Sequence, residues 1–413
     1  MEADVTVIGS GPAGLTAALQ AHEAGAKNVF LLEREEELGG ILKQCIHNGF
    51  GLQQFKTDYT GPEYAERLIQ EVRKTAVHCH LNTMVTGLTS DRTITAVSPE
   101  KGVFEIQSRS VVLAMGCRER TRASIGIPGN RPAGVYTAGL AQRFVNIDGY
   151  LPGKEIVILG SGDIGLIMAR RLTLEGARVK GVYEIMDYPG GLRRNIVQCL
   201  EDFDIPLYLS HTVTDIQGRD RVEGVVIAKV DENMRPVAGS EEFIESDTLL
   251  LSVGLIPENE LSKNAGVRLN PLTQGPITSN IMETSVPGIF SCGNVSTVFD
   301  KVDYVAQTGV LAGMNAAKYA SSAASQQGRP TVDVVPGENV RVLFPQRYCF
   351  DGDMVLFIRA RKPIEQKVRI NLSPLDLSFK RPYARPNEMI RVKAVQKKLK
   401  DVKGPIEVTI TEI

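Results

Sequence analysis

Two glycine-rich segments of the chain have the spacing that binds the phosphates of a nucleotide. The first is Gly9-Ser10-Gly11-Pro12-Ala13-Gly14 and the second is Gly160-Ser161-Gly162-Asp163-Ile164-Gly165. Glu33 and Glu184 each lie 19 residues past the last glycine of their segment (33 − 14 and 184 − 165). In such a motif the glycines let the backbone approach a pyrophosphate, and the acid accepts hydrogen bonds from a ribose. The repeated pattern predicts two nucleotides in one chain, with electrons passing between them.

A glycine pair repeats in register with these motifs. Gly39-Gly40 recurs as Gly190-Gly191, with the same offset of 151 residues that separates the motifs (190 − 39 and 160 − 9). One motif alone is weak evidence in a chain with 39 glycines among 413 residues. The alternative is an ordinary strand–turn–helix in which the glycines serve packing alone. Agreement between motif, acid and pair favours an internal duplication of a nucleotide-binding unit.

The surrounding residues predict the elements that each motif needs. Residues 4–8 and 155–159 are apolar, as in buried parallel strands, and a helix pattern follows each glycine segment. A second strand, over residues 29–32 or 179–183, then ends at Glu33 or Glu184. The pyrophosphate would lie at the helix N-terminus, whose free N–H groups bind anions. A carboxylate at this place accepts from a ribose 2′-OH and repels a 2′-phosphate, so Glu184 predicts NAD rather than NADP.

Composition and charge limit the class of protein. Hydrophobic content of 43% and charged content of 23% are ordinary for a globular protein with two or three domains. No run of 18 uncharged apolar residues is present, which predicts no membrane span. Met1 leads directly into a predicted strand, leaving no room for a signal peptide, and the six cysteines are dispersed without a CxxC pair. We therefore expect a cytoplasmic protein without a metal site.

The C-terminal part is a separate compositional unit. Residues 331–413 carry 16 basic and 10 acidic side chains (+6), whereas the chain totals of 47 and 48 leave 31 and 38 (−7) for residues 1–330. We interpret the excess as solvated charge on a small domain, with an acidic partner as the second reading; nucleic acid is not expected. Alternating apolar residues at 339–344, 354–360, 367–371 and 406–410 predict a β-rich module, and 321–330 resemble a linker.

These features together resemble the two-dinucleotide-binding-domain flavoproteins, the pyridine nucleotide-disulfide oxidoreductase superfamily that includes glutathione reductase. Further markers are Ala114-Met115-Gly116, Ser252-Val253-Gly254 and Pro287-Gly288-Ile289-Phe290-Ser291-Cys292-Gly293-Asn294. The resemblance implies an α/β fold with two Rossmann-like, three-layer ββα domains, followed here by a small C-terminal all-β domain. It implies FAD in residues 1–117, NAD(H) in residues 118–278, and a return to the FAD domain over residues 279–325.

The resemblance also implies which residues bind the cofactors. They lie in the glycine motifs, at strand ends and in the late glycine segment: Gly9, Gly11, Pro12, Ala13, Gly14, Glu33, Arg34, Gly40, Val85, Ala114, Gly116, Gly293 and Asn294 for FAD, and Gly160, Gly162, Asp163, Ile164, Glu184 and Gly254 for NAD(H). The family usually has an aspartate where this chain has Asn294. An asparagine can still form the hydrogen bond to the cofactor, without the charge.

The segment after Gly39-Gly40 departs from the disulfide reductases of this superfamily. Those enzymes carry two redox cysteines there, whereas Leu42 and His47 occupy these two places in this chain. Disulfide reduction by a dithiol relay is therefore not expected. Lys43, Cys45 and His47 are the candidate catalytic residues: a cation near the flavin, a single redox thiol and a general acid–base. The alternatives are a surface cation for Lys43 and a small buried apolar residue for Cys45.

A narrower resemblance suggests the activity. Cys117-Arg118-Glu119-Arg120 and Ile127-Pro128-Gly129-Asn130-Arg131 look like the flavin subunits of opine oxidase, hydrogen cyanide synthase and sarcosine oxidase. Residues 40–52 and the tail look like FAD/NAD oxidoreductases associated with glycerol-3-phosphate dehydrogenase. The implied function is electron transfer between NAD(H) and FAD in a dehydrogenase complex linked to glycerol 3-phosphate. Implied partners are a glycerol-3-phosphate dehydrogenase-like flavoprotein and a small electron-transfer protein; the alternative is a subunit that oxidises a small amine, opine or hydroxy acid directly.

Overall fold

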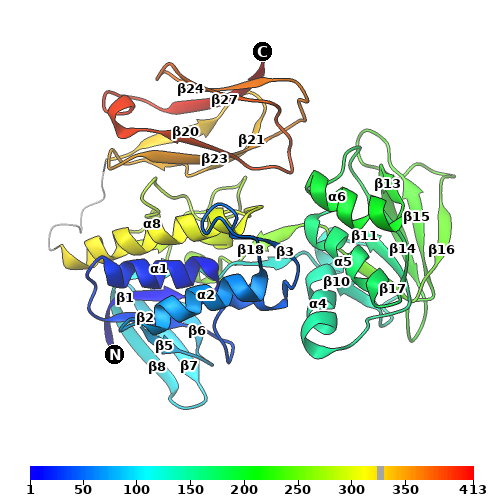
Figure 1. The fold of residues 1–413 in the computed structure, drawn as a ribbon, viewed down its shortest axis with the longest axis horizontal. Helices are drawn as coiled ribbons and strands as arrows, with labels where there is room; N and C mark the ends of the chain where they lie inside the picture. Colours follow the sequence, from blue (N-terminus) through cyan, green and yellow to red (C-terminus); the bar gives the residue numbers. More distant parts are fainter. Residues whose placement is uncertain (323–329) are drawn as a thin grey trace. The chain divides into compact units, whose positions relative to one another are not determined.

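A computed structural model describes residues 1–322 and 330–413 of the chain. They form two compact units, one of Met1–Cys117 with Pro257–Ile413 and the other of Arg118–Ile256 (Figure 1). The expected linker over residues 321–330 lies largely outside the described residues. Within residues 1–322 and 330–413, no helix combines the length and the apolar character that crossing a bilayer requires.

The first unit is built on a sheet with five parallel strands. Their order is β5 (His78–His80), β2 (Val29–Leu32), β1 (Glu2–Ile8), β8 (Gly102–Leu113) and β19 (Ile289–Ser291). The long strand β8 continues into an antiparallel meander with β7 (Thr93–Ser98) and β6 (Met84–Leu88). Helices α1 (Pro12–Glu23), α2 (Gly61–Arg73) and α8 (Val302–Ser321) complete this part of the unit.

Alternation along the strands places one apolar layer on each face of this sheet. Val5, Leu31 and Val112 join α1, α2 and α8 in one core, while Phe30 and Leu113 join the meander in another. Successive residues of a strand point to opposite faces, so strands that are apolar at every position are buried on both. This arrangement is the three-layer ββα domain expected from the sequence.

The second unit repeats this plan. Its parallel sheet has the order β10 (Val135–Thr137), β17 (Thr248–Leu251), β11 (Glu155–Leu159), β12 (Arg178–Glu184) and β13 (Leu207–Leu209). Helices α4 (Ala138–Arg143), α5 (Asp163–Leu174) and α6 (Arg193–Cys199) pack on one face. The meander β14 (His211–Gln217), β15 (Gly224–Lys229) and β16 (Glu242–Glu245) supplies the core on the other. Two Rossmann-like domains are thus confirmed.

The second unit ends earlier than the sequence predicts. It closes at Ile256, not at residue 278. Residues 257–278 belong to the first unit because α7 (Glu260–Asn264) packs against β6, and Ala265 and Val267 enter the apolar layer beneath the meander. The buried Asn259 fixes this return, since its side-chain N–H group donates to the carbonyl of Val295 at 3.1 Å.

The C-terminal residues form two β-sheets around a core of their own. One sheet has the order β22 (Arg347–Tyr348), β20 (Val332–Pro336), β27 (Ile406–Glu412), β24 (Val368–Ser373) and β25 (Leu377–Arg381). The other contains β21 (Val340–Phe344), β23 (Met354–Ala360) and β26 (Ile390–Ala394). The predicted β-rich module is present, and its strand bounds lie within a few residues of the expected ones.

This β domain is joined to the first unit by apolar packing. Phe344, Phe357 and Met389 are buried in the same core as α1 and α8. The ring of Phe299 meets those of Phe344 and Phe357 edge-on, at centroid distances of 5.8 and 5.1 Å. Aromatic pairs of this kind add to the free energy of burial. The domain is therefore an integral part of the first unit.

The close crossing of α1 and α8 depends on glycine. A Cβ atom on Gly313 would overlap the carbonyl oxygen of Ala17 on α1. We therefore predict that Gly313→Ala lowers the free energy of unfolding by about 1–3 kcal/mol, through overpacking. Gly404→Ala is the control, since no described heavy atom lies within 4 Å of a Cβ there. Urea unfolding measures both, and an unchanged midpoint for Gly313→Ala would contradict the prediction.

Candidate nucleotide-binding sites

The first glycine loop is shaped by two close backbone approaches and one open position. Gly9 has a φ of +98°, and a Cβ there would lie 2.6 Å from the carbonyl oxygen of Ala114 at the end of β8. A Cβ on Gly14 would overlap the carbonyl of Gly9. Around Gly11, in contrast, no described heavy atom lies within 4 Å of a Cβ. The backbone here leaves a hollow in front of α1.

The second glycine loop has a similar construction. Gly160 has a φ of +92°, and its Cβ would overlap the carbonyl oxygen of Ser252 at the end of β17. A Cβ on Gly165 would lie 2.6 Å from the Cβ of Ser252. Position 162 is more confined than position 11, because a Cβ there would lie 3.1 Å from the hydroxyl oxygen of Ser252.

Both loops fit a bound pyrophosphate. Helices α1 and α5 follow directly, and neither N-cap glycine has a side chain to cap its helix. In α5 the Ser252 hydroxyl accepts from the amide of Gly165 at 3.1 Å, and among the described residues no side chain does so at the start of α1. Pro12 stands at the start of α1, where its fixed φ suits the first turn and its missing N–H costs no hydrogen bond. The first N–H groups of a helix need an acceptor and favour an anion. The hollow at Gly11 gives a phosphate room to supply that acceptor.

Glu33 is held against the first loop by a serine. It is 6% exposed, and one carboxylate oxygen accepts from both the amide (2.9 Å) and the hydroxyl (2.5 Å) of Ser10. The other oxygen accepts from the amide of Glu35 at 3.0 Å. A buried carboxylate needs such donors, because an unpaired charge loses its hydration without compensation. The acid that the sequence predicts to bind ribose is thus fixed in place by the glycine loop.

Glu184 repeats these contacts in the second unit. It is 8% exposed, and one oxygen accepts from the amide (2.9 Å) and the hydroxyl (2.6 Å) of Ser161. The other accepts from the amide of Met186 at 3.0 Å. The two acids therefore have equivalent hydrogen-bond donors at equivalent positions of the sequence.

The repeated glycine pairs belong to the same network. The amide of Gly39 donates to the hydroxyl oxygen of Ser10 at 3.3 Å, and that of Gly190 to the hydroxyl of Ser161 at 2.7 Å. Each loop thus contains a clamp in which glutamate, serine and glycine pair are joined by hydrogen bonds. Sequence reasoning named the acids and glycines but missed the serines, although Ser10 and Ser161 recur at the offset of 151.

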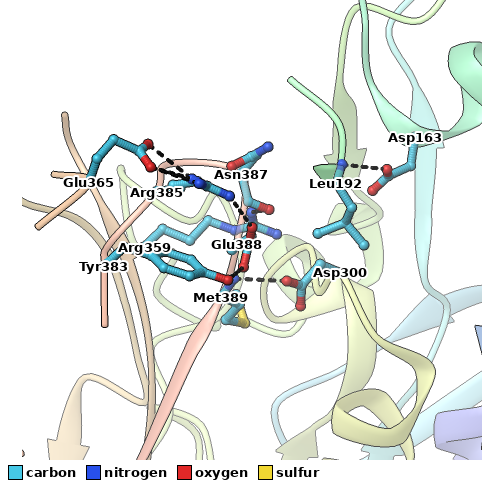
Figure 2. A network of polar contacts seen from close by, with 10 residues as sticks. All are labelled: Asp163, Leu192, Asp300, Arg359, Glu365, Tyr383, Arg385, Asn387, Glu388 and Met389. Atoms are coloured by element: carbon cyan, nitrogen blue, oxygen red, sulfur yellow. Dashed lines mark hydrogen bonds and ion pairs between the residues drawn. The ribbon is translucent and has the colours of Figure 1, made fainter. Parts of the chain in front are cut away.

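Gly40 and Asp163 add one further contact to each loop. A Cβ on Gly40 would lie 3.0 Å from the Cα of Gly11, so this glycine packs directly on the backbone of the first glycine loop. Asp163 accepts from the amide of Leu192 at 2.8 Å (Figure 2) and from the side chain of Asn195 at 2.6 Å. Asp163 therefore ties the second glycine-pair loop to the start of α5, next to Ile164.

The late glycine segment lies against the first loop. A Cβ on Gly293 would lie 2.7 Å from the Cβ of Ala13, and the amide of Gly293 donates to the hydroxyl of Thr308 at 2.9 Å. The Asn294 side chain accepts from the amide of Phe299 at 3.1 Å and donates to the sulfur of Cys117 at 3.6 Å. These contacts fix an uncharged amide at the expected flavin contact.

The remaining residues predicted to contact the cofactors lie at several places in the two units. Arg34 is exposed and pairs with Glu35 at 3.5 Å, whereas Val85 is buried between the sheet and the meander. Gly116 and Gly254 follow β8 and β17, and each has a positive φ. The structure thus brings most predicted FAD residues together at the first loop, with Arg34 at its margin.

The candidate catalytic residues share one short segment. Gly40–Gln44 form a 3-10 turn in which Lys43 pairs with Glu37, and burial lowers the pKa of Lys43 despite the nearby carboxylates of Glu66 and Glu36. The imidazole of His47 contacts the carbonyl of Asn48 through Nδ1 at 3.0 Å and packs on Phe50. Both side chains are half-buried and keep access to solvent.

Cys45 lies under the start of α2. A Cβ on Gly61 would lie 2.8 Å from the Cβ of Cys45, so the helix presses on this residue. Its thiol donates to the carbonyl of Ile41 at 3.3 Å, and burial raises its pKa to about 12. The group is therefore a neutral thiol at ordinary pH, which is the poorly nucleophilic form of cysteine.

Comparison with known proteins agrees with this geometry. The pyridine nucleotide-disulphide oxidoreductase family model matches residues 3–328. The chain is 26% identical over 323 residues to hydrogen cyanide synthase subunit HcnB of Pseudomonas protegens, covering 72% of this chain and 67% of that protein. It is 27% identical over 326 residues to an opine oxidase subunit of Rhizobium meliloti, covering 71% and 59%. Thioredoxin reductase of T. acidophilum has the same fold, with a TM-score of 0.63, 22% identity and coverage of 78% and 99%.

The chain belongs to the pyridine nucleotide-disulphide oxidoreductase family. It is an FAD- and NAD(P)-binding oxidoreductase, in agreement with the two nucleotide sites expected from its sequence. The match covers 67% of the HcnB subunit and 59% of the opine oxidase subunit, so it does not extend over the whole length of either relative.

The two clamps allow a matched pair of tests. Ser161→Ala should raise the Kd for NADH about tenfold while FAD stays bound, because it removes the hydroxyl that donates to Glu184 and accepts from the amide of Gly190. Ser10→Ala should weaken FAD retention by a similar factor and leave NADH binding intact. Fluorescence titration of each nucleotide measures both, and each variant is the control for the other. Equal loss of both nucleotides in either variant would contradict separate clamps.

The environment of Cys45 predicts how its alkylation depends on pH. The raised pKa means that the thiolate forms only as the pH approaches 12. At pH 8 its thiolate fraction is on the order of a thousandth of an ordinary cysteine's. Iodoacetamide labelling of Cys45, followed by mass spectrometry, should therefore accelerate steadily up to pH 11. A rate that levels off near pH 9 would show an accessible, ordinary thiol.

Proposed function

We propose that the protein passes hydride between NAD(H) and FAD as one subunit of a dehydrogenase complex, linked to the oxidation of glycerol 3-phosphate. The duplicated clamp is the observation that carries the proposal. Glu33 and Glu184 have the same donors at nearly the same distances, so both loops are built to hold a nucleotide. A flavoprotein that oxidised its organic substrate alone would have no use for the second clamp.

The absence of a dithiol supports transfer to an acceptor other than a disulfide. Cys45 is the single cysteine of the segment after the first glycine pair, and its pKa of about 12 keeps it protonated. When bound, FAD and NAD(H) supply the redox chemistry. The protein's own residues orient the two nucleotides: Glu33 and Glu184 bind ribose, and the N-termini of α1 and α5 bind phosphate.

Lys43 and His47 are proposed to act near the flavin. Burial makes the Lys43 cation less stable than in water. A negatively charged edge of the flavin ring nearby would stabilise this cation. His47 is half-buried, and imidazole is the side chain whose ordinary titration range suits proton transfer near neutral pH. Both residues follow Gly40 in the sequence, by three and seven residues, and Gly40 packs on the backbone of Gly11.

The proposed role within a complex follows from the relatives and the C-terminal domain. Both curated relatives above are named as subunits. The β domain adds a net charge of +6 to the first unit and suits contact with an acidic flavoprotein or small electron-transfer protein. The second candidate is a protein that oxidises an opine, amine or hydroxy acid directly, which the similarity to the opine oxidase of Rhizobium meliloti favours.

Stopped-flow mixing under anaerobic conditions tests the proposal. NADH should bleach the flavin absorbance of the FAD-loaded protein. NADPH should do so at least about tenfold more weakly at limiting concentration, because Glu184 repels a 2′-phosphate. No bleaching by either nucleotide would refute the proposal.

The variant Gly162→Asp provides the control. A carboxylate in front of α5 repels the NADH pyrophosphate, and its Cβ also meets Ser252. Bleaching by NADH should be lost while FAD content and bleaching by dithionite are unchanged. Flavin reduction by an organic substrate in the Gly162→Asp protein, without any partner, would favour the direct oxidase instead.

A further inference from the structure

A basic cavity lies where the C-terminal β domain meets the first unit. Its volume is about 420 Å³, within the usual range of small-molecule sites. Side chains on its wall include Gln53, Tyr304, Arg381, Tyr383, Arg385 and Arg391. None of these residues belongs to either glycine loop, so the cavity is distinct from the nucleotide sites.

One of the three arginines is already neutralised. Arg385 donates to both oxygens of Glu365, at 2.7 Å through Nη2 and at 3.0 Å through Nε, and it contacts Glu388 at 3.3 Å. Figure 2 shows Arg385 between these two carboxylates. The hydroxyl of Tyr383 also donates to Glu388, at 3.1 Å. This hydrogen-bonded group carries one positive and two negative charges, so Arg385 adds no free positive charge to the cavity.

The other two arginines have no carboxylate partner among the described residues. Arg381 donates to the backbone carbonyls of Lys380 (2.8 Å) and Arg391 (2.7 Å), which leaves its positive charge uncompensated. Arg391 donates through Nε to the side chain of Gln307 on α8 at 3.0 Å. No described residue accepts from its two terminal nitrogens. Two positive charges thus line one cavity, a repulsion that an anion would relieve.

The arginines are held in place before any ligand arrives. Arg391 is oriented by Gln307, and Arg381 by two carbonyl oxygens. Fixed guanidinium groups bind phosphate through paired N–H donors and lose little conformational entropy on doing so. We propose that this cavity is a binding site for a phosphate group, either free or carried by a small metabolite.

The opposite wall links the cavity to the candidate catalytic segment. Asp303 of α8 accepts from the amides of Gln53 and Gln54, at 3.1 and 3.3 Å. Gln53 lies six residues after His47 (53 − 47), in a loop fixed at the start of the helix that carries Tyr304 and Gln307. A ligand in the cavity would therefore contact the loop that follows the flavin-side segment.

Binding of inorganic phosphate to the FAD-loaded full-length protein tests the proposal. Equilibrium dialysis with labelled phosphate at constant ionic strength should show one saturable site. Arg391→Gln should lower its affinity at least about tenfold, through loss of charge-assisted hydrogen bonds. Arg341→Gln is the matched control, because Arg341 is exposed on β21 and away from the cavity wall. If the Arg391→Gln protein melts at a lower temperature than the wild type in the absence of phosphate, Arg381→Gln provides a second test.

Defined outcomes would overturn the proposal. One is equal phosphate uptake by the wild type, Arg391→Gln and Arg381→Gln proteins, which would place the anion in a glycine loop. Another is no saturable uptake up to roughly 10 mM phosphate. A third is that the wild-type protein takes up no phosphate but binds a tetra-aspartate peptide, and that Arg391→Gln abolishes the peptide binding. That last result would assign the cavity to an acidic polypeptide. None of these outcomes depends on electron transfer between NADH and the flavin.

Discussion

The hydrogen bonds between a buried glutamate and the serine of its glycine loop are the constraint on which both nucleotide sites depend. A carboxylate removed from water is stable only if donors replace its hydration. Ser10 and Ser161 supply two donors each, and the amides of Glu35 and Met186 supply a third. Since the same serines accept from the glycine pairs, the buried glutamate of each unit orients its glycine loop and the following turn together.

The duplicated clamp separates what the two units share from what distinguishes them. Strand, glycine loop, helix, acid and glycine pair have the same spacing and the same hydrogen bonds. Before the pair, the copies differ mainly at Pro12 and Asp163 and in the confinement of Gly162; after the pair they diverge fully. In the first unit the turn carries Lys43, Cys45 and His47, and α2 presses on it through Gly61. In the second unit Leu192 is tied to Asp163 and α6 begins at Arg193. Binding is thus duplicated, whereas the residues proposed to act near the flavin occur once.

Much of the fold could be predicted because glycine spacing and strand patterns are local. The motif at Gly9 required a strand before it and a helix after it, and both are present. The boundary at Ile256 could not be predicted, because the sequence around Ala265 and Val267 has no periodic pattern that assigns these residues to the sheet of the first or of the second unit. The environment of Cys45 depends on Gly61, which lies outside the two glycine motifs. The serines of the clamps are common residues, and their role is visible only from their hydrogen bonds in the folded chain. The proposed phosphate cavity needs Gln53 and Arg391 to meet across more than 300 residues of sequence.

The aromatic packing of the β domain has a consequence for how the chain can unfold. Phe344, Phe357 and Met389 are buried in the core that also contains α1 and α8, so the sandwich cannot leave without exposing Phe299 and Tyr304. The two parts consequently form one cooperative folding unit, even though the sandwich has a core of its own. During synthesis, the core to which residues 1–117 contribute is therefore complete only after Met389 has left the ribosome.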